Sequence, residues 1–425
     1  MLLYHGLRRR EMSRISKLFE AFDNKNRNCL YLMNKSFRVN NNYSLDTAIK
    51  LCSEYGMSLK IIILEPFELN QKNLEFFHEI TDDLADVLKD FSNDIINLKR
   101  TDDIFKHLEK TYAIVVDKSY LKFDIEYFQK IKHYAFNNDI SLYEVESNVF
   151  VPIMESSKKE EYSARTIRTK INALIDDYQT EVLTDFFGSK AYNKALGILE
   201  DFIINKLDDY HLHNDPSLDK TSLLSPYLKY GFISPVTIYN RLKNVVSDNK
   251  AAFLEELIVR RELAYNFVYY NPTYDNFDYM TYDWAYQTMN NHIKDRRDYL
   301  YSEIDYLKFN THDKYFNAAM KEMVYLGRMH SYMRMYWCKK IIEWSRTYEE
   351  AFYLALKLND YYFLDGLTPN GYCGVAWCFG KHDRAWTERK IFGKLRYMNA
   401  SGLERKFNIE NYVIQMDEIE KERLR

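Results

Sequence analysis

Trp337 and Trp344 stand seven residues apart in a stretch whose apolar residues recur at helical spacing. Seven residues rise roughly 10.5 Å along a helix and return to nearly the same face. Two indole rings so placed suit stepwise electron transfer, and they suit the packing of a helical core equally well. The spacing alone leaves both interpretations open.

Positive charge gathers among aromatic rings near the C-terminal end. Residues 381–406 contain 8 Lys/Arg and 3 Asp/Glu, a net +5, together with Trp386, Phe392 and Tyr397. Cations suit phosphates, and aromatic rings suit stacking on unpaired or everted bases. A solvated basic helix face is an equally good interpretation of the charge alone.

Three hydroxyl side chains stand at an expected helix start. Thr221, Ser222 and Ser225 come just before or at this start, and Pro226 takes an early helical position. Hydroxyls and free backbone N–H groups in such a place can hold phosphate oxygens. Plain N-capping explains the same residue types.

Composition limits the elements that can position these residues. The chain has 425 residues and a formal net charge of −3, so two domains are expected. Aromatic residues make up 16%, which excludes a disordered or collagen-like chain. Only 12 Gly and 7 Pro are present, which favours long helices over a many-turned β fold.

Cysteine usage and hydropathy indicate the compartment. Five cysteines, an odd count, fit neither a zinc pair nor a disulfide framework. No segment approaches the roughly 18–20 apolar residues of a membrane helix. Residues 1–24 are predicted to be a helical extension without the apolar core of a signal peptide. We therefore expect an intracellular, cytoplasmic protein, or a nuclear one in a eukaryotic host.

Residues 25–155 have the pattern of a Rossmann-like α/β domain. Strands are expected at 29–33, 61–64, 113–116 and 142–146, with helices between them at 44–55 and 73–91. Strands alternating with helices predict βαβ units and a parallel sheet. Neither GxGxxG nor GxxxxGK[ST] occurs, so the usual dinucleotide and P-loop sites have no support.

The remainder of the chain is expected to be helical. Residues 156–200 are predicted to connect the domains, beginning with an exposed polar stretch at 155–161. Residues 201–425 are predicted to form an all-α domain with helices at 251–270, 317–344 and 348–358. Residues 51–150 carry 11 Lys/Arg and 19 Asp/Glu, a net −8, which disfavours polyanion binding by the α/β domain.

Several motifs in the helical part resemble those of a known family. They are Leu364-Asp-Gly-Leu-Thr-Pro-Asn-Gly-Tyr-Cys-Gly-Val-Ala-Trp377, His382-Asp-Arg-Ala-Trp386, Phe253-Leu-Glu-Glu-Leu-Ile-Val-Arg-Arg-Glu-Leu263, Met329-His-Ser-Tyr-Met-Arg-Met-Tyr-Trp337 and Thr221-Ser-Leu-Leu-Ser-Pro226. Together they resemble the class II cyclobutane pyrimidine dimer (CPD) photolyases of the photolyase/cryptochrome family. The resemblance covers about residues 160–407.

This resemblance implies a fold, a reaction and partners. The expected fold is an α/β N-terminal Rossmann-like antenna domain followed by an all-α C-terminal domain that binds FAD in a U-shape. The expected reaction is light-driven electron transfer from reduced FAD to a CPD flipped out of UV-damaged DNA. A monomer without a metal ion is expected. The residues that match FAD-contacting positions are Tyr210, Thr221, Ser222, Leu223, Ser225, Arg334, Asn359 and Asp365.

Arg334 and Asp365 match the ion pair that lies against the reactive edge of the flavin in this family. A guanidinium there can stabilise negative charge on the reduced ring. Asn359 matches an asparagine near flavin N5, where a neutral amide can hydrogen-bond several redox states. A helix C-cap is the other interpretation of Asn359.

Glu256, Met335, Trp377 and Asn359 are the expected catalytic residues. Glu256 matches an acid that contacts the dimer, where a protonated or proton-sharing carboxyl can bond the thymine carbonyls. Its other interpretation is an i,i+4 ion pair with Arg260. Met335 and Trp377 would form apolar walls around the flipped dimer.

The basic segment supplies the expected DNA contacts. The candidates are Trp386, Asp383 and Arg384 beside the lesion pocket, with Lys381 and Arg396 as phosphate contacts.

Trp337 and Trp344 match two members of the tryptophan chain that photoreduces FAD in class II enzymes. The third member lies in a Thr-His-Asp-x-x-Trp-Asn pattern, which here reads Thr311-His-Asp-Lys-Tyr-Phe316-Asn317. Phenylalanine is a poor relay because it is much harder to oxidise than tryptophan. We predict that photoreduction is slow or takes another path, with Tyr315 as a substitute, while repair persists.

Other positions depart from the family pattern. Leu367-Thr368 stands where Arg-Asp is common, and the N-terminal signature survives only as Met33-Asn-Lys-Ser-Phe-Arg-Val-Asn-Asn-Asn42. An antenna chromophore, either 8-hydroxy-deazaflavin or folate, is expected without assigned residues. The alternative function is that of a cryptochrome-like blue-light photoreceptor that binds FAD without repairing DNA.

Overall fold

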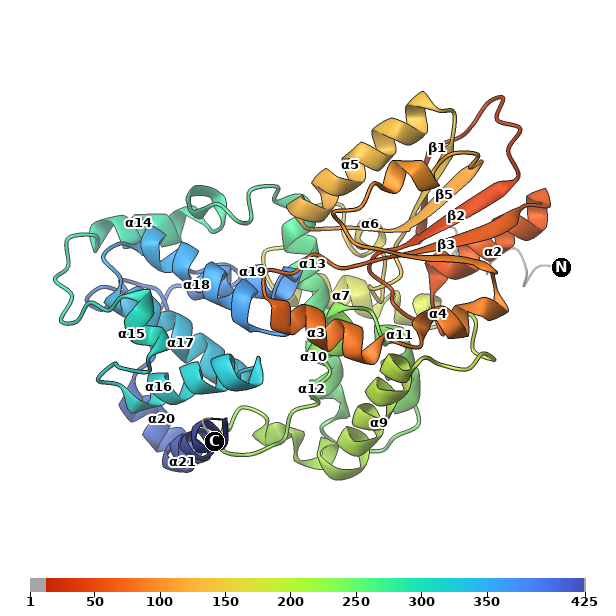
Figure 1. Cartoon of the computed structure of the whole chain (residues 1–425). Helices are drawn as coiled ribbons and strands as arrows, with labels where there is room; N and C mark the ends of the chain where they lie inside the picture. The colour runs from red at the N-terminus through yellow and green to blue at the C-terminus, as the bar shows by residue number, and fades with distance from the viewer. Residues whose placement is uncertain (1–12, 424–425) are drawn as a thin grey trace.

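A computed structural model describes residues 13–423. Its N-terminal part is a six-stranded sheet in the order β1-β6-β5-β2-β3-β4, flanked by helices (Figure 1). The strands are β1 (Ile15–Phe19), β2 (Asn28–Met33), β3 (Ser58–Leu64), β4 (Asp94–Leu98), β5 (Ala113–Asp117) and β6 (Ser141–Val145). All neighbours are parallel except β1, which runs antiparallel to β6. The predicted α/β domain with a parallel sheet is confirmed.

Alternation along the central strands explains why helices cover both faces of the sheet. Leu30 and Leu32 of β2 face one apolar cluster, which includes residues of α5 (Lys122–Asn137). Tyr31 and Met33 face the other cluster, which includes residues of α2 (Tyr43–Tyr55). Successive side chains of a strand point to opposite faces, so an uninterrupted apolar run is buried on both sides.

Two sequence predictions fail in this domain. The predicted N-terminal helix is wrong at residues 15–19, which form β1, and residues 1–12 of that extension lie outside the described part. β1 has no alternation strong enough to predict a strand, and its place is set by pairing with β6. The predicted helix at 73–91 breaks into α3 (Gln71–Ile80), α4 (Leu84–Val87) and a 3₁₀ turn, and β4 follows as an unpredicted strand.

The rest of the chain is helical, as predicted. Its helices are α6 (Ile153–Ser156), α7 (Ala164–Asn172), α8 (Ile175–Tyr178), α9 (Lys190–Asn205), α10 (Ser225–Lys229), α11 (Pro235–Leu242), α12 (Lys250–Leu254), α13 (Arg261–Tyr270), α14 (Asp283–Asn291), α15 (Glu303–Leu307), α16 (Lys314–Lys321), α17 (Ser331–Trp344), α18 (Tyr348–Tyr362), α19 (Pro369–Cys378), α20 (Ala400–Lys406) and α21 (Ile409–Arg423). Two π-helical turns, η4 (Glu255–Arg260) and η6 (Glu322–Leu326), interrupt the long helices expected at 251–270 and 317–344.

The predicted connection between the domains is corrected in two respects. Its first part is only partly exposed, because Ser156, Ser157 and Glu161 are buried while Glu155, Lys158 and Lys159 are exposed. Glu161 pairs with Lys170 of α7 and accepts a hydrogen bond from Ser157, which satisfies its charge. The boundary at residue 200 falls inside α9, a continuous helix, so no domain boundary lies there.

The α/β part reaches into the helical part through α3. Asn73 donates a hydrogen bond to the carbonyl of Phe363, and Lys72 donates to the carbonyl of Tyr325. Phe76 of α3 also contacts the ring of Tyr227 of α10, and Figure 1 shows α3 in front of α10. Among residues 13–423, no helix combines the length and apolar composition that crossing a bilayer requires.

Candidate functional site

A cavity of about 530 Å³ opens among the helices of the C-terminal part. Its walls come from α3, α10, α17, the two π-helical turns η4 and η6, and the segment after α18. The residues predicted from the sequence that line it are Tyr210, Thr221, Ser222, Leu223, Ser225, Glu256, Arg334 and Asp365. Segments far apart in the sequence therefore supply side chains to one hollow.

The Arg334–Asp365 ion pair forms part of this wall. Nη2 of Arg334 lies 2.6 Å from Oδ1 of Asp365, and both side chains are largely buried. The guanidinium also stacks on the ring of Phe363 at 3.9 Å and donates through Nε to the carbonyl of Met329. These contacts hold a positive charge in a fixed orientation at the cavity surface.

Asn359 lies behind the wall rather than on it. It sits inside α18, is buried, and donates through Nδ2 to Asp360. Asn370, at the start of α19, lines the cavity instead. The prediction that Asn359 contacts the flavin stays a prediction, whereas its other interpretation as a helix C-cap is wrong, because α18 continues to Tyr362. Asn370 follows Asp365 by five residues in the same motif, and this proximity could have indicated that Asn370 also lines the cavity.

Glu256 projects from the π-helical turn η4, an irregularity often found at functional sites. Its suggested ion pair with Arg260 is absent, because Nε of Arg260 lies 3.3 Å from Glu255, which also pairs with Arg168. Desolvation raises the pKa of the Glu256 carboxyl, against the opposing charges of Arg260 and His213. This carboxyl is therefore suited to carry a proton at the cavity wall.

Two further residues of the cavity escaped the sequence analysis. Arg261 is buried, and its Nη1 has no hydrogen-bond partner in the described structure. His330 bonds Glu322 through Nδ1 at 3.0 Å, and its Nε2 likewise has no partner there. Buried polar atoms left unpaired are costly, so a polar or anionic ligand in this cavity would satisfy them. Phe76 of α3 adds an aromatic wall.

The two predicted electron-transfer tryptophans lie on α17, as the seven-residue spacing indicates, and both are buried. Nε1 of Trp337 approaches the sulfur of Met320 at 3.1 Å. Trp344 packs edge-on against Phe316, with ring centroids 5.0 Å apart. Met335 on α17 and Trp377 on α19 are partly exposed and pack against the same core.

The predicted DNA-contacting residues build an alternating stack of cations and indoles. The Arg396 guanidinium lies 4.1 Å from the Trp386 ring and 4.9 Å from the Trp377 ring, and Arg384 covers Trp386 at 4.8 Å. Asp383 accepts from both Nε and Nη2 of Arg396 and from Nε1 of Trp386. The arrangement holds flat surfaces and positive charge side by side.

Lys381 does not belong to this stack. Its side chain is buried, pairs with Glu160 and lies 4.5 Å from the Tyr282 ring. The prediction of a phosphate contact is wrong for Lys381, because a buried ammonium already paired with a carboxylate cannot reach a DNA backbone.

Comparison with curated proteins connects this site to known enzymes. A deoxyribodipyrimidine photo-lyase of Methanothermobacter thermautotrophicus is 37% identical over 420 residues, covering 90% of this chain and 93% of the relative. The chain belongs to the photolyase/cryptochrome family. The photo-lyase of Arabidopsis thaliana is 38% identical over 65% of each chain, and that of Potorous tridactylus is 36% identical over 71% of this chain and 63% of the relative. No family model matches the chain.

Solved structures confirm the photolyase/cryptochrome fold. The Synechocystis cryptochrome has a TM-score of 0.72 at 12% identity, covering 92% of this chain and 88% of its own. The class III photolyase of Agrobacterium tumefaciens has a TM-score of 0.68 at 16% identity, covering 93% and 87%. The photolyase of Sulfolobus tokodaii, described with two FAD molecules, has a TM-score of 0.68 at 15% identity, covering 91% and 89%.

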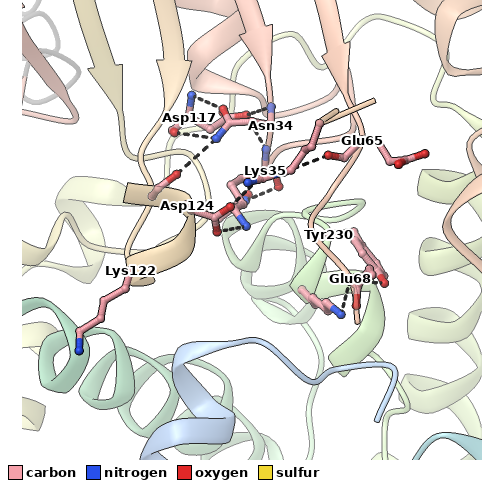
Figure 2. A network of polar contacts seen from close by, with 12 residues as sticks. Asn34, Lys35, Glu65, Glu68, Asp117, Lys122, Asp124 and Tyr230 are labelled. Carbon is pink, nitrogen blue, oxygen red and sulfur yellow. Dashed lines mark hydrogen bonds and ion pairs between the residues drawn. The ribbon is translucent and has the colours of Figure 1, made fainter. Parts of the chain in front are cut away.

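A second hollow of this photolyase/cryptochrome chain lies where β2, β5 and β6 end, a usual ligand position in parallel sheets. It measures about 40 Å³, and paired charges surround it. Figure 2 shows Lys35 against Asp124, and Glu68 with its partner Tyr230. Since ligand pockets usually measure roughly 300–1,000 Å³, this hollow is too small to take a chromophore as it stands. The antenna chromophore stays a prediction without residues.

Proposed function

We propose that this protein repairs cyclobutane pyrimidine dimers in DNA, using light and a reduced FAD held in the 530 Å³ cavity. The observation that carries the proposal is the Arg334–Asp365 pair on the wall of the same cavity that Glu256 lines. A cofactor site and a candidate acid for the substrate therefore share one hollow. The class II assignment belongs to this proposal.

The residues of the cavity fit FAD. Arg261 and His330 offer buried polar atoms that need partners, Thr221, Ser222 and Ser225 offer hydroxyls for phosphate oxygens, and Phe76 and Tyr210 offer rings. When bound, reduced FAD supplies the electron that light transfers to the dimer. Arg334, which lines the cavity, would place positive charge near the bound flavin and so favour its reduced, anionic form.

The lesion would contact Glu256 on the cavity wall, and Met335 and Trp377, which do not line the cavity, are proposed as its apolar contacts outside it. Because desolvation raises its pKa, Glu256 can hold a proton and donate it to a thymine carbonyl as negative charge develops there. Met335 and Trp377 offer partly exposed apolar surface for a flipped base pair.

The cation–indole stack would hold the damaged strand. Arg384 is exposed and can reach a phosphate, while Trp386 lies between the guanidinium groups of Arg384 and Arg396 and helps to hold Arg384 in place. Asp383 positions this stack by bonding both Arg396 and Trp386.

Repair of a defined substrate tests the proposal. Purified protein with fully reduced FAD is mixed with an oligonucleotide that contains a thymine dimer and is illuminated with blue or near-UV light. We expect thymine absorbance to recover in the light and not in the dark. A Trp386→Ala variant should keep its flavin spectrum and bind the damaged oligonucleotide more weakly, since it removes the ring against which Arg384, the proposed phosphate contact, rests.

Failure of the assay would favour the other function. If dimer-containing DNA is bound but never repaired with the cofactor fully reduced, the protein is a cryptochrome-like photoreceptor. The likeness to the Synechocystis cryptochrome concerns the fold alone and supports neither function over the other.

A further inference from the structure

The ring of Phe316 stands beside Trp344, and other aromatic rings surround that indole. Tyr301 meets Trp344 edge-on with centroids 5.4 Å apart, and His312 meets it at 5.1 Å. Tyr299 stacks on His312 at 3.8 Å and is 48% exposed. Ring contacts therefore continue from Trp344 to the surface without passing through Phe316.

Tyr301 has the hydrogen bonds that a redox-active phenol needs. Its Oη lies 2.8 Å from Nδ1 of His312 and accepts the backbone N–H of the same residue at 3.1 Å. When Nδ1 of His312 carries no proton, the Tyr301 hydroxyl donates its own proton to that nitrogen. A phenol loses its proton when it is oxidised, so a base in direct contact makes that oxidation easier.

The competing tyrosines lack this combination. Tyr306 lies 6.4 Å from Trp344, but it is fully buried and its hydroxyl has no hydrogen-bond partner among the described residues. Tyr315, the substitute suggested by the sequence, donates its hydroxyl to Glu404 and Glu410 on the helices α20 and α21. Within residues 13–423 no ring contact joins Tyr315 to a tryptophan.

We propose that Tyr301, with His312 as its proton acceptor, is the terminal electron donor beyond Trp344. The proposal deepens the proposed function, because its oxidant is a light-excited oxidised flavin in the cavity. In this sequence Trp337 would supply one electron to the bound flavin, and Trp344, two helical turns away on α17, would then reduce Trp337. Tyr301 then gives one electron to the Trp344 radical cation and its proton to Nδ1 of His312.

This step balances in charge and atoms. Trp344 becomes neutral again, and Tyr301 becomes a neutral radical beside an imidazolium. A thiol from solution then transfers a hydrogen atom to Tyr301 and becomes a thiyl radical, and His312 releases its proton to water. The exposed ring of Tyr299 lies at the end where such a reductant would arrive.

Flash experiments on the protein with oxidised flavin test the assignment. The tyrosyl radical is followed by transient absorption and electron paramagnetic resonance after a laser pulse. Tyr301→Phe keeps the ring on Trp344 and should abolish the tyrosyl signal, leaving a tryptophan radical that recombines. His312→Phe keeps the ring contact but removes the base, and should slow tyrosyl formation by about 10²-fold.

Tyr306→Phe is the matched control, because the Tyr306 ring contacts the same indole while its buried hydroxyl has no proton acceptor among the described residues. It should leave the tyrosyl signal unchanged. A tyrosyl signal that survives in Tyr301→Phe would overturn the proposal. A signal that Tyr306→Phe abolishes as well would also overturn it.

A dimer-repair assay with chemically reduced cofactor distinguishes failure of the donor assignment from failure of the proposed function. All three variants should repair at the wild-type rate once the cofactor has been reduced chemically, since repair then needs no outside donor. If the wild-type protein gives the tyrosyl signal but repairs nothing, only the proposed function fails. If it repairs but gives no tyrosyl signal, only the donor assignment fails.

Discussion

The proton on Glu256 is a property of a single residue and its surroundings. Desolvation at the cavity wall raises the pKa of this carboxyl, and Arg260 and His213 oppose that shift through their charges. The neutral carboxyl can donate a hydrogen bond, whereas the ionised one can only accept. Its protonation state therefore decides whether it can stabilise negative charge on a thymine.

Repair should depend on pH through Glu256. The donating form is present below the raised pKa and is lost as pH rises through it, so the repair yield should fall in that direction. Glu256→Gln keeps an N–H donor at every pH and should give a flat profile. Glu256→Leu should lower the yield at every pH by about 10²-fold, the size of a lost proton donor.

This prediction is checked by repair yield per absorbed photon, measured against pH for the three proteins with chemically reduced flavin. A Glu256→Gln protein whose profile still follows that of the wild type would show that another group titrates.

The contact between α18 and α19 determines which side chains lie behind the cavity wall. Gly371 in α19 lies so close to Asn359 in α18 that a Cβ there would sit 2.5 Å from its Nδ2. Gly374 of the same helix faces open space. The missing side chain of Gly371 therefore permits the close approach of α18 and α19, whereas Gly374 takes no part in that contact.

Alanine at these two positions should have opposite effects. Gly371→Ala must displace the buried Asn359 and should destabilise the protein by about 1–3 kcal/mol, with weaker flavin retention. Gly374→Ala should stabilise it by about 0.5–1 kcal/mol, because alanine favours a helix over glycine. Denaturant unfolding and the flavin content after gel filtration measure both effects. Equal effects of the two substitutions would contradict this account of the helix contact.

A second contact between elements ties the loop that carries the cation–indole stack to the end of α14. His292 lies 2.7 Å from Asp295 and 2.9 Å from Glu388, and Asp295 accepts the backbone N–H of Ile391. Hydrogen bonds to Asp295 and then Glu388 raise the pKa of His292. The imidazolium therefore connects two carboxylates from separate segments.

The stability from this contact should depend on pH. It is fully present below the ordinary pKa of 6.5 and is lost as pH rises through the higher pKa of the folded protein. Glu388→Gln should lower the pKa of His292, as seen by NMR titration of its ring. The variant should also be less stable than the wild type at acidic pH and nearly equal to it at alkaline pH. A His292 ring that titrates identically in both proteins would exclude the contact in solution.

At the scale of the molecule, one apolar cluster runs from the sheet into the helices. It includes Tyr31 and Ile61 of the sheet together with Phe202 of α9 and Leu263 of α13. Glu262 of α13 is buried at this junction and accepts the backbone N–H groups of Phe150 and Val151. Figure 1 accordingly shows α13 between the sheet and the other helices.

Burial raises the pKa of Glu262 from 4.5 to about 7. The unfolded chain releases this proton near pH 4.5 and the folded protein only near 7, so the stability linked to the group falls as pH rises across that interval. The loss amounts to roughly 3 kcal/mol. Glu262→Gln should remove this part of the pH dependence of the free energy of unfolding.

Denaturant titrations across that range of pH measure the effect, and Glu349→Gln, at an exposed carboxyl, serves as the control. Glu349→Gln should keep the wild-type slope of unfolding free energy against pH. The prediction fails if Glu262→Gln keeps that slope as well.

The central strands and the helix that carries the two tryptophans could be predicted from the sequence, because they depend on local residue patterns. The apolar runs at 29–33, 61–64 and 113–116 become β2, β3 and β5, since strands buried on both faces need continuous apolar residues. The spacing of Trp337 and Trp344 places both on α17, because helical geometry fixes which residues share a face. Motif resemblance indicated the family, and with it eight residues of the cavity wall.

Other features were decided by contacts between distant segments. Asn370 rather than Asn359 faces the cavity because the approach of α19 to α18 at Gly371 covers Asn359. Lys381 is buried because Glu160, more than two hundred residues away, lies against it. Tyr301 rather than Tyr315 meets Trp344, since the segment before α15 folds over the end of α17. Local sequence determines which elements form, and only their packing determines which side chains of those elements face a cavity, a partner or water.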